Sequence, residues 1–409
     1  MFPSSDSTLS SISELSLDPD DSFALDDVVV VDPPPGLCPS TTSTNPHDLF
    51  ARSTFPQPQT VIKLPNTHPT LPFQLQTSKH VYTCTKLLFT GATGMIFQTQ
   101  CNHAIKLIHD EHATYEESCI FTQLHHPHLL HALDVGCTTF TIEEDNEPIT
   151  DAIYYFFVTL RADYTLVYLD ITGVELTRKI KWIQQLYLAL LYLYEHDYVH
   201  GDIHPKNVLL YQNNALMCDF NLSLNLKYNQ TLEQRLETVT STFPFCSPLA
   251  LIRNNYLCPS PEDAALFDHD EYTELHRSVI DRTVIIENAC GTSSDLRDFS
   301  KCDVFAFGQL ITYILFNRQS FLGANHIRLF PQSIKQYVSY VQNPDSVLTA
   351  YLTTQCVRHQ FSDDIRAYQR IARSTTFSMS SLKSVLQKML AVQEDQRALL
   401  PELSEIMLW

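Results

Sequence analysis

The order of two sequence textures constrains the fold of this 409-residue chain more than any other feature. Between residues 80 and 160, short runs rich in β-branched and aromatic residues predict strands at Val81–Thr90, Met95–Thr99, His103–Ile108 and Ala152–Leu160. One helical pattern, Tyr115–Leu124, lies among them. After residue 165, apolar residues recur at helical spacing in Ile180–His196, Val304–Phe316 and Leu382–Val392. Strands followed by helices indicate an α+β protein with a small β-rich lobe and a larger helical lobe.

The first 75 residues differ in composition from the rest of the chain. They hold 12 of the 22 prolines, and nine acidic residues stand against two basic ones. Because proline lacks a backbone donor and charged residues oppose burial, we predict a disordered tail rich in Ser, Pro and acids over residues 1–75. The β-rich lobe is then expected at 76–160 and the helical lobe at 161–409.

Whole-chain composition excludes several functional classes. The 46 acidic and 27 basic residues give a net charge of −19, which argues against direct nucleic-acid binding and is compatible with basic protein substrates. The eleven cysteines form no C-x-x-C pair, which indicates reduced thiols in an intracellular protein. No apolar run approaches the roughly 18 residues of a membrane span, so no membrane association is expected. The sequence indicates no oligomeric state.

The densest group of chemically active residues follows the pattern at Ile180–His196. Asp202 and Asn207 lie within the stretch HGDIHPKN, and Asp219 follows a strand-like segment further on. Two acids and an amide that converge from two loops can position a hydroxyl group and hold Mg²⁺ through oxygen ligands.

These residues resemble the H-R-D…N and D-F-G elements of the eukaryotic protein kinase superfamily. The preceding elements of that family occur in order. Lys106 fits the V-A-I-K lysine that contacts the α- and β-phosphates, and Glu117 fits its carboxylate partner, with Glu116 as the competing choice. A glycine loop spans 89–96, with Phe89 in place of its first glycine. The nucleotide-contacting residues that the resemblance implies are Gly91, Ala92, Thr93, Gly94, Ile96, Ala104, Lys106, Val158, Leu160 and Leu209.

Later elements of the family also occur, so the resemblance spans roughly residues 85–405. The segment Thr242–Pro248 resembles the peptide-positioning loop, through Thr242, Phe245 and Pro248. Asp303 resembles the acid that accepts hydrogen bonds from the catalytic loop, and His200 and Arg397 are implied as further structural supports. The resemblance implies a bilobal kinase-like fold, ATP with Mg²⁺ or Mn²⁺, and basic or Ser/Thr-bearing protein substrates. It makes Asp202 the catalytic base, and the metal ligands would be Asp219 and Asn207.

Several positions depart from the family pattern. Gly201 replaces the arginine that binds a phosphate on the activation segment, and His204 replaces the lysine that contacts the γ-phosphate. His204 is then a candidate hydrogen-bond donor to the phosphate, and Lys206 a nearby substitute. Asn221 replaces a glycine, for which asparagine is suited because it tolerates unusual backbone angles. Leu249 replaces the glutamate that usually pairs with the residue at Arg397, and an insertion is expected at about 250–302.

The departures resemble the conserved herpesvirus protein kinases of the tegument type. The resemblance rests on the motifs DFNLS at 219–223 and FGQL at 307–310, and the hinge-like segment 157–166 fits it more loosely. The resemblance implies a serine/threonine kinase of the virion tegument that acts on viral and host proteins in the host nucleus and cytoplasm. No basic cluster of this chain fits a nuclear localisation signal.

Two alternative functions remain open at this point. The stretch HGDIHPKN is also similar to the H-G-D-x-H-P-x-N element of small-molecule and atypical kinases, which usually lack the peptide-positioning loop and the Asp303-type helix. A pseudokinase scaffold would explain the replacements at Phe89, His204 and Asn221. Against it, all five residues that position and neutralise the phosphates are present, namely Lys106, Glu117, Asp202, Asn207 and Asp219.

Overall fold

The computed structural model describes ten segments of the chain. All ten belong to one compact unit, Thr44–Trp409. They are residues 61–65, 71–91, 94–109, 115–144, 147–227, 245–248, 298–317, 321–322, 338–393 and 395–409. The expected tail before residue 61 and most of the expected insertion at 250–302 lie outside them. Only the last five residues of that insertion are described, and they form the start of a helix at Asp298.

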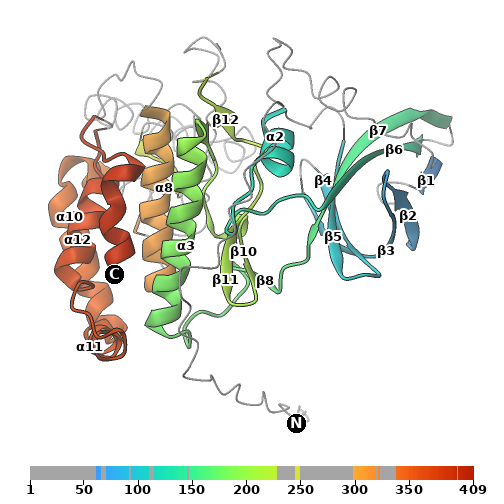
Figure 1. Cartoon of the computed structure of the whole chain (residues 1–409). Helices are drawn as coiled ribbons and strands as arrows, with labels where there is room; N and C mark the ends of the chain where they lie inside the picture. Colours follow the sequence, from blue (N-terminus) through green and yellow to red (C-terminus); the bar gives the residue numbers. More distant parts are fainter. Residues whose placement is uncertain are drawn as a thin grey trace, which may run out of the picture. The chain divides into compact units, whose positions relative to one another are not determined.

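A seven-stranded sheet forms the strand-rich part, in the order β1-β6-β7-β5-β4-β3-β2 (Figure 1). Its strands are β1 (Val61–Pro65), β2 (Phe73–Gln76), β3 (Val81–Thr90), β4 (Gly94–Thr99), β5 (His103–His109), β6 (Asp134–Glu144) and β7 (Glu147–Leu160). All neighbours pair antiparallel except β1, which runs parallel to β6. One face buries an apolar cluster of its own, which includes Phe97, Ile105 and Val158.

The first two strands correct the predicted extent of the tail. β1 and the first three residues of β2 lie within the range predicted for the tail, and Leu75 is fully buried. The alternation of buried and exposed residues in β2 matches a strand with one face on the core. The boundary predicted at residue 75 is therefore too late, because the surrounding prolines dominate the composition of a segment that nevertheless joins the sheet.

Helix α2 (Tyr115–Gln123) connects the sheet to the rest of the unit. Its Phe121 ring stacks on Phe157 of β7 at 4.8 Å between centroids and meets Phe220 edge-on at 5.5 Å. Since aromatic pairs in these arrangements attract beyond simple burial, the helix is held from both sides. This double packing explains why residues 117–121 are all buried although the helix has no single apolar face.

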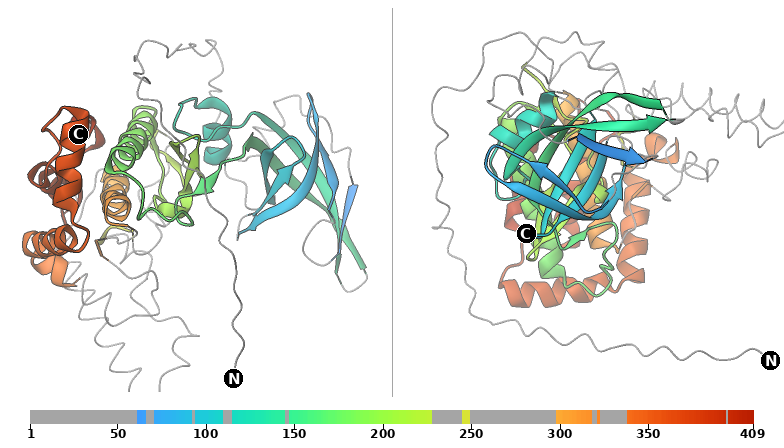
Figure 2. Two further views of the ribbon diagram at one scale, coloured as in Figure 1. Left: turned by 90° about the horizontal axis from the view of Figure 1, so that it is seen from below. Right: turned by 90° about the vertical axis from the view of Figure 1, so that its right-hand side faces the viewer.

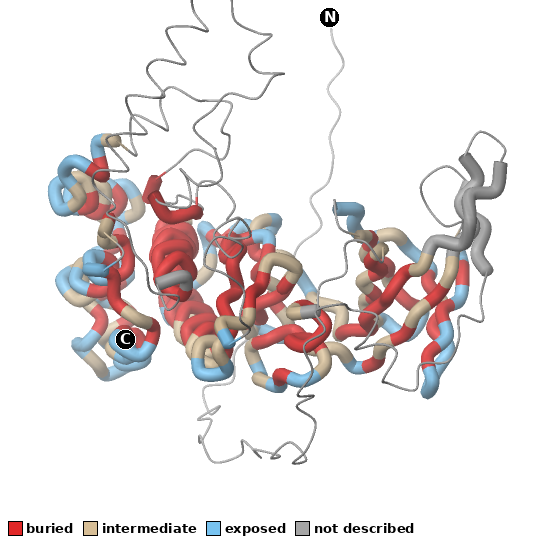
Figure 3. The backbone as a smooth tube through the Cα atoms, turned by 90° about the horizontal axis from the view of Figure 1, so that it is seen from above, coloured by how far each residue is buried: buried red, intermediate tan, exposed pale blue. Residues whose placement is uncertain are grey.

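The helical part is built around α3 (Leu176–Glu195) and α8 (Asp298–Leu315), which contact each other. The two helices lie side by side in Figure 1 and in the left view of Figure 2, where α3 is green and α8 is orange. The other helices among the described residues of this part are α10 (Pro344–Arg358), α11 (Phe361–Ala372), α12 (Met379–Met389) and the 3₁₀ segment η5 (Leu400–Leu408). Figure 3 shows the central helices mostly buried, whereas the C-terminal helices alternate between buried and exposed residues, as expected of an outer layer.

Short strands carry the loops between these two parts. Strands β8 (Tyr164–Thr165), β10 (Val208–Tyr211) and β11 (Asn214–Met217) form one small sheet, and β9 (Tyr198–Val199) pairs with β12 (Leu224–Asn225). The 3₁₀ turn η3 (Pro205–Asn207) directly precedes β10.

The order of strands followed by helices confirms the predicted α+β class. The strands expected at 81–90, 95–99 and 103–108 and the helices expected at 115–124, 180–196 and 304–316 are present within a few residues. Helix α12 ends at Met389, three residues before the predicted end. Among the described segments, no helix combines the length and apolar character needed to cross a membrane.

Candidate active site

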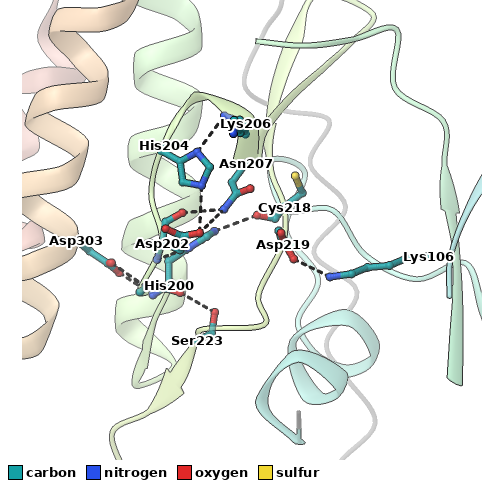
Figure 4. Close-up of polar contacts among 11 residues, drawn as sticks. Lys106, His200, Asp202, His204, Lys206, Asn207, Cys218, Asp219, Ser223 and Asp303 are labelled. Atoms are coloured by element: carbon teal, nitrogen blue, oxygen red, sulfur yellow. Dashed lines mark hydrogen bonds and ion pairs between the residues drawn. The ribbon is translucent and has the colours of Figure 1, made fainter. Parts of the chain in front are cut away.

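Lys106 on β5 joins the two parts of the unit through two ion pairs. Its Nζ lies 2.5 Å from Glu117 Oε1 on α2 and 2.6 Å from Asp219 Oδ1 (the Asp219 contact is drawn in Figure 4). Burial alone would lower the pKa of Lys106, but the carboxylates of Glu117 and Asp219 outweigh it and raise the pKa well above its ordinary value. The lysine is therefore a permanent cation. Of the two glutamates that the sequence offered, Glu117 makes this contact.

The face of the sheet that carries Lys106 is defined by strand register. Residues paired directly across antiparallel strands share a face, and Lys106 pairs with Ile96 on one side and Phe157 on the other. Ala104 pairs with Thr159, so Thr159 also lies on this face. The predicted nucleotide contacts included neither Phe157 nor Thr159, and both of these residues are buried.

Val158 differs from its predicted role as a nucleotide contact. It pairs with Ile105, lies on the opposite face from Lys106 and is fully buried in the cluster on that side. Its side chain is therefore directed away from Lys106, and its carbonyl oxygen already accepts the Leu133 amide at 2.7 Å. Two more of the predicted contacts, Leu160 and Leu209, are half-buried and pack against the core of the helical part.

The glycine loop is a tight connection between β3 and β4. The Gly91 amide donates to the Gly94 carbonyl at 2.9 Å, and a Cβ on Gly94 would lie 2.3 Å from the Leu107 carbonyl oxygen. Only glycine fits such a close approach of two backbones. Phe89, which replaces the first glycine of the pattern, is half-exposed beside Gly91. Ala92 and Thr93 lie outside the described residues.

Asp202 is held by two side chains of its own loop. His204 Nε2 lies 3.1 Å from Asp202 Oδ2, and Asn207 Nδ2 donates to the same oxygen at 3.1 Å and to the Asp202 carbonyl at 2.9 Å (Figure 4). All three residues are buried, whereas Lys206 is exposed. The Asn207 amide and the His204 ring meet the same carboxylate oxygen, and together they fix the plane of the carboxylate.

Asp303 on α8 anchors the start of this loop. Its two carboxylate oxygens accept the backbone amides of His200 at 2.6 Å and of Gly201 at 3.0 Å. Burial raises the pKa of Asp303 to about 7, an effect that these two hydrogen bonds oppose. The His200 ring continues the network, because its Nε2 lies 3.2 Å from the Cys218 carbonyl and its Nδ1 accepts the Asp202 amide at 3.3 Å.

The backbone explains why position 201 is a glycine, which the sequence alone did not indicate. Its φ is +81°, and a Cβ built on it would lie 2.3 Å from the Leu222 carbonyl oxygen. An arginine at this position would collide with the backbone that follows Asp219. The loss of the arginine is therefore coupled to the close approach of two loops.

The segment that begins at Asp219 is held by the buried Phe220 ring, and its backbone is strained at Asp219. Phe220 is fully buried, 5.5 Å from Phe121 and 5.3 Å from the His200 ring, so it links α2 to the loop of Asp202. Asp219 itself has a φ of +65°, which costs about 1–2 kcal/mol for a residue with a side chain. The unusual backbone angle expected at Asn221 thus occurs at Asp219. Such strain persists only where surrounding contacts impose it, as at functional sites.

Asp219 and Asn207 fit a magnesium ion by their chemistry. Because Asn207 Nδ2 is used by Asp202, its amide oxygen is the atom left to face a cation. An amide oxygen and a carboxylate are hard ligands of the kind that Mg²⁺ prefers, completed by phosphate and water oxygens. Among the described residues, no group of three or more His, Cys, Asp or Glu side chains forms a metal site of its own. The arrangement is suited to a metal that arrives with a phosphate ligand.

Of the predicted peptide-positioning residues, Phe245 and Pro248 are described and Thr242 lies outside the described segments. Both described residues are buried, and the Phe245 ring lies 6.4 Å from the His204 ring and 6.2 Å from that of Tyr313 on α8. The structure thus brings this segment against the loop of Asp202.

Arg397 supports the helical part from a buried position. Its guanidinium donates to the carbonyls of Lys301 and Ala391 and lies 5.0 Å from the centre of the Phe305 ring. These contacts connect the chain after α12 to α8, close to Asp303 in sequence. The replacement of the family glutamate by Leu249 has therefore not removed the structural setting of this arginine.

Comparison with protein families agrees with this geometry. Residues 87–262 match the family model described as protein kinase domain. The matched segment contains the glycine loop, Lys106, Glu117, the loop of Asp202 and Asp219. The predicted kinase-like fold, with a β-rich N-lobe and a helical C-lobe, is thereby confirmed.

Proposed function

We propose that this protein, which carries a protein kinase domain at residues 87–262, is an active serine/threonine kinase that transfers the γ-phosphate of ATP to protein hydroxyl groups. The observation that carries the proposal is the double ion pair of Lys106 with Glu117 and Asp219. It brings the phosphate-binding lysine, its partner on α2 and the metal-binding acid together, beside an intact Asp202–Asn207 loop.

Each of these residues has a task in the transfer. Lys106 supplies a fixed positive charge to the phosphates, and Glu117 holds it in place. Asp219 and Asn207 would hold Mg²⁺, which when bound neutralises phosphate charge. Asp202 accepts the proton of the acceptor hydroxyl, while the hydroxyl oxygen forms a bond to the γ-phosphorus. The bond to the β–γ bridging oxygen breaks, and ADP leaves.

The choice of serine or threonine and the viral setting rest on resemblance. The motifs at 219–223 and 307–310 are similar to those of the herpesvirus tegument kinases. We extend the proposal accordingly to viral and host proteins as substrates, in the virion tegument and in the nucleus and cytoplasm of an infected cell.

Two observations weigh against the rival functions. Asp303 accepts both amides of the loop before Asp202, an anchor that small-molecule kinases usually lack. A scaffold without catalysis has no need for a buried lysine between two carboxylates, because ionic groups are costly to bury.

Transfer of labelled γ-phosphate tests the proposal. Wild-type protein and Asp219→Asn are incubated with Mg-ATP, alone and with a basic protein mixture, and labelled residues are identified by mass spectrometry. The proposal predicts phosphoserine or phosphothreonine with the wild type only. Label on tyrosine alone would reject the residue class. Binding of Mg-ATP without protein label would favour a small-molecule acceptor, and neither binding nor label would favour a scaffold.

A further inference from the structure

The His204 ring is engaged at both of its nitrogen atoms. Its Nδ1 accepts the backbone N–H of Lys206 at 3.3 Å, which caps the turn η3, and its Nε2 lies 3.1 Å from Asp202 Oδ2. A backbone N–H only donates, so Nδ1 carries no hydrogen. The tautomer that follows has its hydrogen on Nε2, where it donates to the Asp202 carboxylate.

We propose that His204 is a positioning residue for Asp202 and takes no part in binding the γ-phosphate. The inference rests on the proposed function, since it assigns Asp202 as the base. The Lys206 amide fixes the ring, the ring donates to Asp202 Oδ2, and Asn207 donates to the same oxygen. Together they set the direction in which the second carboxylate oxygen meets the acceptor hydroxyl.

The surroundings of the ring oppose the alternative role. His204 is 6% exposed, and its ring lies 6.4 Å from that of Phe245 in the peptide-positioning segment. A turn of the ring toward a phosphate would break the bond to Asp202 and leave a buried carboxylate with one donor fewer. Loss of such a bond to a charged group is typically more costly than loss of a neutral one.

Two substitutions separate the halves of this arrangement. In His204→Gln, the side-chain amide nitrogen reaches the place of Nε2 and keeps the donor to Asp202. In His204→Asn, the shorter side chain offers an oxygen near the place of Nδ1 and keeps the cap on Lys206, but it does not reach Asp202. The two variants are matched in polarity, so each controls for the other.

Steady-state kinetics with Mg-ATP and a protein acceptor then decide the role. We expect His204→Gln to keep kcat within about 3-fold of the wild type and His204→Asn to lower it about 10- to 100-fold, because a small misplacement of a reacting group has effects of that size. KM for ATP should stay within about 2-fold in both. A large rise of KM for ATP in both variants, or a gain of activity in His204→Lys, would overturn the inference in favour of phosphate binding.

A second measurement is independent of catalysis. Long-range proton–nitrogen NMR on protein labelled at histidine reports the tautomer, and the His204 signal is assigned by its absence in His204→Gln. The expected result is a neutral ring with hydrogen on Nε2. Hydrogen on Nδ1, or on both nitrogens at neutral pH, would refute the inference. If the wild type transfers no phosphate, the proposed function fails, while this spectrum still decides how His204 holds Asp202.

Discussion

Replacing Gly201 by alanine tests whether the close approach of two loops organises the site. Gly201 has a φ of +81°, and its Cβ would lie 2.3 Å from the Leu222 carbonyl oxygen. The left-handed backbone costs about 1–2 kcal/mol for a residue with a Cβ. Overpacking against a backbone atom adds about 1–3 kcal/mol. The expected loss in the free energy of unfolding is therefore about 2–5 kcal/mol.

Urea unfolding at constant pH measures this loss directly. Gly173→Ala is the matched control, because a Cβ at Gly173 meets nothing within 4 Å and its φ lies outside the left-handed region. That substitution should leave the protein unchanged or stabilise it by up to about 1 kcal/mol. Since Leu222 follows Asp219 by three residues, Gly201→Ala should also impair phosphate transfer, even where the protein stays folded. Equal unfolding midpoints and slopes for the two variants would show that the reasoning is wrong.

Three further predictions concern ionisable side chains. In Lys106→Met, Glu117 loses the cation beside it, so the free energy of unfolding measured in urea should fall by about 3–5 kcal/mol. Adding Glu117→Leu should recover part of this loss, and no recovery would contradict the account. In Asp303→Asn, the amide group presents a donor to one of the two backbone donors, which should cost about 1–3 kcal/mol by the same assay, whereas wild-type stability would mean the anchor is unimportant. Burial, with His128 and His196 nearby, lowers the pKa of His126 from 6.5 to about 4 in the folded state. The neutral ring therefore supports the fold above pH 6.5, and as pH falls from 6.5 toward 4 the wild type should lose stability relative to His126→Phe. The phenylalanine keeps an aromatic ring beside Tyr192. A difference in stability that does not depend on pH would contradict this prediction.

The fold was largely predictable where local pattern and long-range packing agree. The strands at 81–108 and the helix at 180–196 have periodic apolar residues, and the structure buries those faces. Strand β1 was missed because its partner β6 is more than 70 residues away and runs parallel to it, a pairing that leaves no local signal. β2 is only four residues long and follows a proline-rich stretch, so composition obscured it.

The candidate site was predictable in its spacing and less so in its geometry. The resemblance to kinase motifs was sufficient to pair Lys106 with Glu117, and the structure places the two side chains in contact. The sidedness of β7, which directs Val158 away from Lys106, required the strand register. The roles of Gly201 and His204 depend on a backbone angle and on a ring orientation, and neither is encoded by residue identity alone.

Separating nucleotide binding from transfer in Asp202→Asn tests the central claim most directly. The variant keeps an oxygen to accept from His204 and Asn207 but loses the base for the acceptor hydroxyl. Binding of Mg-ATP is measured by calorimetry, and transfer to protein is measured by single-turnover labelling on the same samples. The account predicts an unchanged dissociation constant and a transfer rate reduced by about 10²- to 10⁴-fold. A variant that transfers phosphate at the wild-type rate would contradict it.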